Sequence, residues 1–174
     1  MNLQSSLERH ASWLDHLTSE WREGRSALCS DGDPRWHAVT AALQTLRNKG
    51  RHAVRIVDAD CGTGSFLMDV LRSAHRLGFT AIEGRGIARS SVRVALAQTA
   101  ARRLHDSAIG VSFEAADPLE ALKSERDFPA DIVLWSGPSR EPAIPELLNT
   151  LHAAGDVVIG VHPYLQAARQ ARLT

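Results

Sequence analysis

Short apolar runs and helically spaced apolar residues alternate along most of the chain. Two amphipathic helices are predicted first, one over residues 2–28 and one that begins with Asp33 as N-cap and Pro34 in its first turn and closes at Gly50. Their buried stripes are expected to consist of Leu3, Leu7, Leu14, Leu17 and Trp21, and of Trp36, Val39, Leu43 and Leu46. The pattern leaves open whether these helices cover a ligand site as a lid or simply pack against the rest of the protein.

From residue 53 onward the alternation becomes regular. Strands are predicted at 53–58, 80–87, 110–115, 131–136 and 156–162, with helices near 63–77, 90–105, 117–125 and 141–154. This spacing predicts an α/β fold with a doubly wound, mostly parallel five-stranded sheet and right-handed crossovers. We expect one domain over 1–174, with 1–50 as a helical extension and 51–174 as the core.

Composition and charge narrow the function classes. The 174 residues carry 20 basic and 20 acidic side chains, so no net charge steers the chain toward nucleic acid or anionic membranes. Cys29 and Cys61 are interpreted as free thiols, and the start of the chain does not read as a secretion signal. The eight histidines lack metal-ligand spacing, and no apolar run approaches the ~18 residues of a membrane span. We therefore expect a cytoplasmic protein without a metal site.

The stretch from Ala53 to Leu67, AVRIVDADCGTGSFL, carries the clearest functional signal. A β-branched run ends in Asp58, a turn with Gly62 and Gly64 follows, and an amphipathic helix begins immediately afterwards. Its apolar face is expected to be Phe66, Leu67, Val70, Leu71 and Ala74. A strand, a tight glycine turn and a helix together present backbone N–H groups and a positive helix end to a nucleotide-like ligand. The chain is thus predicted to bind a cofactor.

The turn resembles motif I of the class I S-adenosylmethionine (SAM) dependent methyltransferases, which reads acidic-x-Gly-x-Gly-x-Gly. The matching residues are Asp58, Ala59, Asp60, Cys61, Gly62, Thr63 and Gly64. Asp60 replaces the first glycine, and its carboxylate would either pair with the ammonium of SAM or repel its carboxylate. The dinucleotide pattern G-x-G-x-x-G fits worse, because Leu67 stands at its third glycine. The resemblance implies SAM as cofactor and S-adenosylhomocysteine as product.

The second and third strands extend the resemblance. The family phrase at the end of the second strand is Gly86-Ile87-Ala88-Arg89-Ser90, where Ala88 replaces the carboxylate that binds the ribose hydroxyls. Glu83, five residues upstream, is an alternative source of that carboxylate. After the third strand come Asp117 and Pro118. The resemblance places Asp117 near the adenine, and the local pattern makes it the N-cap of the next helix.

The fourth strand ends in Trp135 and Ser136, and in the family this end faces the transferred methyl group. Trp135 either stacks on the ligand or belongs to the core. The (Asn/Asp)-Pro-Pro-aromatic motif of enzymes that methylate amino groups of nucleic acids is reduced to Ser136-Gly137-Pro138-Ser139, which argues against base methylation. The predicted cofactor-binding residues are therefore Asp58, Ala59, Asp60, Cys61, Gly62, Gly64, Ile87, Ala88, Arg89, Asp117, Pro118, Trp135 and Ser136.

The resemblance implies methyl transfer from SAM to a small-molecule acceptor. No catalytic residue is assigned, and the candidates for a base are Ser136, Glu141, His162 and Tyr164. The alternatives are a non-catalytic partner protein that keeps the fold, and a nicotinamide-dependent oxidoreductase. The family continues with two strands beyond the fifth, which this chain is expected to lack. We expect the last helix, the N-terminal helices, a second subunit or a protein partner to cover the edge of the fifth strand.

Overall fold

The computed structural model describes residues 32–136 and 144–160 of the protein. The described strands are β1 Ala53–Asp58, β2 Ala81–Ala88, β3 Ile109–Ala115, β4 Ala130–Trp135 and β5 Gly155–Gly160. The helices are α3 Trp36–Asn48, α4 Ser65–Arg76, α5 Ser91–Ala101, α6 Pro118–Lys123 and α7 Ile144–Ala154, with a 3₁₀ helix η1 at Ser124–Asp127. The predicted helix over 2–28 and the candidate bases Glu141, His162 and Tyr164 lie outside the described residues.

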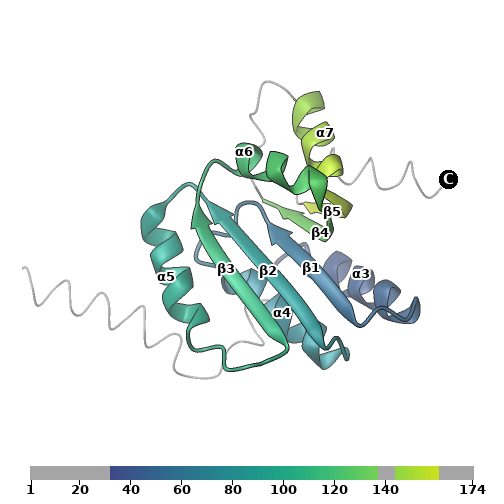
Figure 1. The fold of residues 1–174 in the computed structure, drawn as a ribbon. Helices are drawn as coiled ribbons and strands as arrows, with labels where there is room; N and C mark the ends of the chain where they lie inside the picture. The colour runs from purple at the N-terminus through teal and green to yellow at the C-terminus, as the bar shows by residue number, and fades with distance from the viewer. Residues whose placement is uncertain (1–31, 137–143, 161–174) are drawn as a thin grey trace, which may run out of the picture. The chain divides into compact units, whose positions relative to one another are not determined.

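The five described strands form one sheet in the order β3-β2-β1-β4-β5, and every pair of neighbours is parallel (Figure 1). Each strand begins and ends within two residues of its predicted bounds. The chain passes from β1 to β2 and β3 on one side and returns to β4 and β5 on the other. The strand order therefore reverses between β1 and β4, and ligands of open α/β sheets bind at such a reversal.

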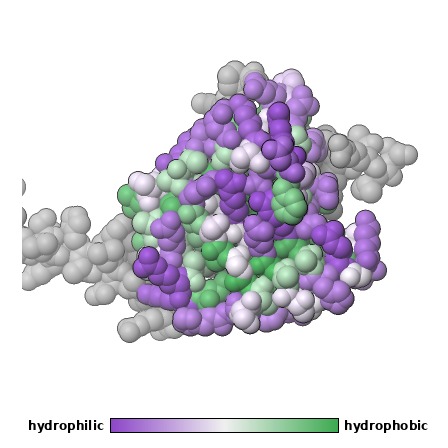
Figure 2. All heavy atoms as spheres, in the orientation of Figure 1, coloured by the Kyte–Doolittle hydropathy of each residue, from purple (hydrophilic) through white to green (hydrophobic). Residues whose placement is uncertain are grey.

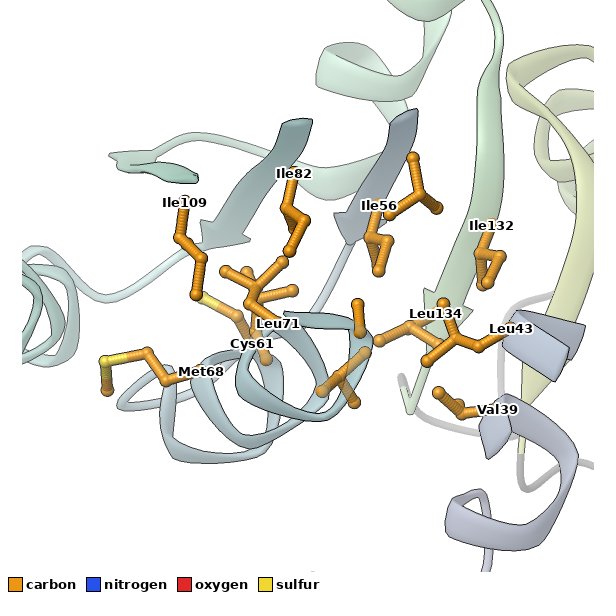
Figure 3. Close-up of a cluster of buried hydrophobic side chains, with 14 of the residues drawn as sticks. Val39, Leu43, Ile56, Cys61, Met68, Leu71, Ile82, Ile109, Ile132 and Leu134 are labelled. Atoms are coloured by element: carbon orange, nitrogen blue, oxygen red, sulfur yellow. The ribbon is translucent and has the colours of Figure 1, made fainter. Parts of the chain in front are cut away.

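Helices cover both faces of the sheet, as the doubly wound prediction requires. On one face α3, α4 and α5 bury a core that includes Val39, Leu71, Val94 and Ile132. Figure 3 labels Val39, Leu71 and Ile132 in this core. Figure 1 shows α3 and α4 behind the strands. On the other face α6 and α7 contribute apolar residues to a second cluster, whose buried members include Val57, Ile87, Leu122, Val133, Trp135 and Leu151. β4 is buried along its whole length and reads as a nearly continuous apolar run, whereas buried and more exposed residues alternate in β2 and β3.

The helix α3 packs as part of this core. Val39 and Leu43 are fully buried, and Trp36 and Leu46 pack against them as predicted. Gly50 adopts a φ of 78° and its N–H donates to the carbonyl of Arg47, which confirms the predicted helix end. The predicted start is wrong: the helix begins at Trp36, and the N-cap position belongs to Arg35 and not to Asp33. The buried side chain of Arg35 contacts Asp58 of β1 and Phe66 of α4. A capping pattern considers only neighbouring residues and therefore does not reveal these contacts.

A charged network lies on the face of the sheet that carries α6. The buried carboxylate of Glu125, in η1, accepts hydrogen bonds from Arg55 of β1 and Arg85 of β2. Arg55 also pairs with Glu83, and Arg85 with Glu114 of β3. In the space-filling view of Figure 2, hydrophilic residues cover much of the surface turned to the viewer. The network thus joins η1 to three strands through charge-assisted hydrogen bonds.

Candidate functional site at the carboxyl edge of the sheet

The predicted site residues converge on the edge of the sheet where the parallel strands end. Backbone hydrogen bonds join the segments: Cys61 N–H donates to the Ile87 carbonyl at 3.0 Å, and Ala59 N–H to that of Leu134 at 2.9 Å. The Ser136 hydroxyl donates to the carbonyl of Asp60 at 3.1 Å. The turn after β1 is therefore held by β2 on one side and by the end of β4 on the other, at the point where the strand order reverses.

The two glycines of the turn have different roles. Both adopt left-handed backbone angles, with φ of 57° at Gly62 and 77° at Gly64, which favour glycine. A Cβ at Gly64 would come within 2.5 Å of the Phe113 ring, so this glycine allows α4 to begin directly against β3. Among the residues that the structure describes, no atom lies within 4 Å of a Cβ placed at Gly62. Gly62 therefore faces open space and is the position at which a ligand can approach the backbone.

Asp58 makes a contact that the sequence analysis did not predict. Its carboxylate is fully buried and forms an ion pair with Arg35, with 3.8 Å between Oδ1 and Nη1. The same oxygen accepts from the N–H of Asp60 at 3.4 Å, and the Arg35 guanidinium lies 4.1 Å from the centre of the Phe66 ring. Asp58 thus links the turn to Arg35 from beneath the protein surface. No sequence signal links it to Arg35, because the pair depends on how α3 packs.

Cys61 is a buried free thiol, as expected. Burial, together with the negative charges of Asp58 and Asp60, raises its pKa to about 12. A thiol with this pKa stays protonated at neutral pH and is a poor nucleophile. Cys61 therefore contributes packing at the base of the turn and not covalent chemistry.

Where β2 ends, the carboxylate that the resemblance would place at the ribose is missing. Ala88 is buried and has no acceptor in its side chain. Glu83 does not replace it, because Glu83 lies in the first half of β2 and pairs with Arg55. The suggested substitution of Glu83 for the missing carboxylate is thus wrong.

Arg89 reaches from the end of β2 to Asp117, at the end of β3. Its Nε and Nη2 both donate to Asp117 Oδ2, at 3.0 and 2.9 Å. Asp117 Oδ1 accepts from the N–H groups of Leu119 and Glu120, which confirms the predicted N-cap of α6. Burial raises the pKa of Asp117, but the hydrogen bonds from Arg89 and from the backbone outweigh it and lower the pKa overall. The carboxylate is thus ionised and held at two points.

At the end of β4, Trp135 is 2% exposed and packs in the second core cluster. The interpretation of Trp135 as a core residue is confirmed, and its ring is not available for stacking on a ligand. Ser136 is half-buried and braces the turn through Asp60. The predicted residues therefore lie together, with the side chains of Asp58, Cys61 and Trp135 buried beneath the edge and those of Arg89 and Asp117 open to solvent.

Comparison with solved structures finds the same architecture in methyltransferases. A putative class I SAM-dependent methyltransferase from Listeria monocytogenes is 20% identical and aligns over 79% of this chain and 41% of its own, with a TM-score of 0.51. The cyclopropane synthase MmaA2 from Mycobacterium tuberculosis is 15% identical over 69% of this chain and 38% of its own, also at 0.51. The bifunctional kinase-methyltransferase WbdD is 16% identical over 74% of this chain and 31% of its own, at 0.54.

The chain has the fold of the class I SAM-dependent methyltransferases. The predicted resemblance is confirmed at the level of the fold. The chain spans less than half the length of these three proteins. No protein-family model matches the sequence, and no curated protein sequence does so either.

A pocket of about 590 Å³ lies at the opposite edge of the methyltransferase fold, where the strands begin. Its lining includes Arg51 and Arg55, which pair with Asp131 and with Glu83 and Glu125 respectively. Because these charges compensate one another, the pocket offers no excess charge to a ligand. Ligands of open α/β sheets bind at the carboxyl edge instead.

Over residues 32–136 and 144–160, no three His, Cys, Asp or Glu side chains gather in a way that could hold a metal ion. Within the same part of the chain, no helix is long and apolar enough to cross a membrane.

Proposed function

We propose that the protein binds SAM at the carboxyl edge of the sheet and transfers its methyl group to a small-molecule acceptor. The observation that carries this proposal is Gly62, a left-handed glycine that faces open space where the strand order of a methyltransferase fold reverses. The residues of the turn, Asp58 to Gly64, would hold the amino-acid part of the ligand, and the ends of β2 and β3 would hold its nucleoside.

Charge at the turn suits a cationic ligand. Asp60 is half-buried two residues before Gly62, and the sulfonium, ammonium and carboxylate groups of SAM together give it a net positive charge. At about 4 Å and an effective dielectric constant near 20, one such attraction amounts to roughly 4 kcal/mol before desolvation costs. Bound SAM would supply a methyl group on a good leaving group, so the protein's task is to place the acceptor in line and exclude water. This chemistry needs a general base only for acceptors that keep their proton.

A second candidate is a partner protein that keeps the fold without methyl transfer. Ala88 favours it, because without a protein carboxylate at this position the ribose hydroxyls lose hydrogen bonds that contribute about 1 kcal/mol each. The partner or second subunit expected at the edge of β5 suits this candidate, since β5 ends the sheet among the described strands. That cover, and a cytoplasmic location, stay predictions.

Calorimetric titration with SAM and S-adenosylhomocysteine tests the proposal. We expect micromolar binding, equivalent to about −8 kcal/mol at 1 µM. Gly62→Ala places a methyl group in the proposed ligand space and should weaken binding at least about tenfold, a change of roughly 1.4 kcal/mol. Gly110→Ala is the matched control and should bind as the unaltered protein does, because Gly110 lies near the start of β3, away from the carboxyl ends of the strands. No heat at millimolar ligand with folded protein would overturn the proposal and favour the partner protein.

A further inference from the structure

The end of β2 is followed by an arginine and lacks the carboxylate that commonly binds a ribose. In Rossmann-like folds an acidic residue there accepts hydrogen bonds from the ribose hydroxyls, whereas a nearby arginine accommodates a ribose phosphate. In this chain Ala88 stands at the end of β2, and Arg89 follows it directly. The side chain of Arg89 is 52% exposed, so a ligand can reach its guanidinium.

Arg89 and Asp117 project from adjacent strand ends. Ala88 is opposite Ala115 in the parallel ladder, and the N–H of Ala116 donates to the Ala88 carbonyl at 3.1 Å. The side chains of Arg89 and Asp117 contact each other above this hydrogen bond and are exposed to solvent at the same edge of the sheet as Gly62. A ligand that extends from the turn along the ends of β2 and β3 would therefore lie beside this ion pair.

The ion pair is suited to opening. An exposed pair adds little to stability, whereas an arginine binds phosphate through strong charge-assisted hydrogen bonds. The two carboxylate oxygens of Asp117 have different partners: Oδ1 caps α6, and Oδ2 accepts hydrogen bonds from Arg89. Arg89 can therefore leave without uncapping the helix, and Oδ2 then becomes an acceptor for an amino group such as that of adenine.

We propose that this edge binds an adenosine ligand phosphorylated on its ribose, at the 2′ or 3′ oxygen, with Arg89 moving from Asp117 to the phosphate. The inference concerns ligands other than SAM, because the ribose of SAM carries no phosphate. It rests on the proposed function only in placing an adenosine ligand at this edge. Arg89 is then the residue that determines whether the site prefers a phosphorylated ribose.

The test compares the affinities of adenosine, 5′-AMP, 3′-AMP and 2′-AMP, measured by calorimetry on the unaltered protein and two variants. We expect 2′-AMP or 3′-AMP to bind about tenfold more tightly than adenosine, which is the gain expected from one charge-assisted contact. 5′-AMP has the same charge in another place and should not share this gain. Arg89→Ala should abolish the preference, and Arg103→Ala, an exposed arginine just beyond α5, should keep it.

The outcomes separate this inference from methyl transfer. Binding of S-adenosylhomocysteine without a preference for the 2′- or 3′-phosphate would leave the proposed function standing and overturn the inference. A phosphate preference that depends on Arg89, without binding of S-adenosylhomocysteine, would support the inference and overturn methyl transfer. Equal affinity for the three phosphates, or a preference that survives Arg89→Ala, would also overturn the inference. The preferred isomer identifies whether Arg89 recognises a 2′- or a 3′-phosphate.

Discussion

At the scale of single residues, Asp117 shows how a half-exposed carboxylate becomes fixed. Two backbone N–H groups hold one of its oxygens, and Arg89 holds the other. Because its pKa is lowered in the folded protein, its contribution to stability is complete above the pKa of the unfolded chain. It is lost as the pH falls through the lower folded value. The loss therefore lies on the acidic side of the ordinary aspartate pKa.

Arg89→Ala should raise the pKa of Asp117 toward its ordinary value without restoring it fully, because the N–H groups of Leu119 and Glu120 remain. A carbon-detected NMR titration of the carboxyl group measures this directly. Arg103→Ala should leave the titration unchanged. If Arg89→Ala also left it unchanged, the ion pair on which the phosphate inference depends would not form in solution.

At the scale of elements, the turn between β1 and α4 depends on two glycines for different reasons. Gly64 has both a left-handed backbone and a side-chain space already filled by Phe113. Gly62 has the left-handed backbone alone. The same substitution at the two positions therefore separates backbone strain from overpacking.

We expect Gly64→Ala to lower the free energy of unfolding by about 2–4 kcal/mol, the sum of left-handed strain and overpacking. Gly62→Ala should cost only about 1–2 kcal/mol, from strain alone. Urea denaturation measures both, with Gly110→Ala as a control expected to stay within about 0.5 kcal/mol. Equal costs at Gly62 and Gly64 would contradict the close packing of the turn on Phe113.

At the scale of the whole molecule, charges as well as apolar clusters hold the layers together. Glu125 is 2% exposed, and its carboxylate ties η1 to β1 and β2 through Arg55 and Arg85. Burial lowers the pKa of Arg55, but Glu83 and Glu125 outweigh it and raise the pKa above its ordinary value. The guanidinium therefore stays charged beneath η1.

Glu125→Ala should lower the free energy of unfolding by about 3 kcal/mol, because it leaves Arg55 and Arg85 without the buried carboxylate that they share. Glu83 also pairs with Arg55 but is 59% exposed, so Glu83→Ala should cost no more than about 1 kcal/mol. Thermal or urea unfolding of the two variants provides the comparison. A loss at Glu125 no larger than at Glu83 would show that the network contributes nothing beyond surface pairing.

The sequence by itself determined the features that depend on local chain geometry. The bounds of β1, the glycine end of α3 at Gly50, the N-cap at Asp117 and the turn at Gly62 all follow from residue types within a few positions of one another. Such features are readable because backbone angles, caps and apolar periodicity are properties of short segments.

Only the tertiary structure decided which side chains meet. The pairing of Arg35 with Asp58, the reach of Arg89 to Asp117 and the burial of Glu125 join residues from different elements. The start of α3 was misplaced for the same reason, because the buried contact of Arg35 is absent from the local pattern that favoured Asp33. These contacts depend on strand order and helix packing, which bring together residues whose spacing in the chain carries no signal.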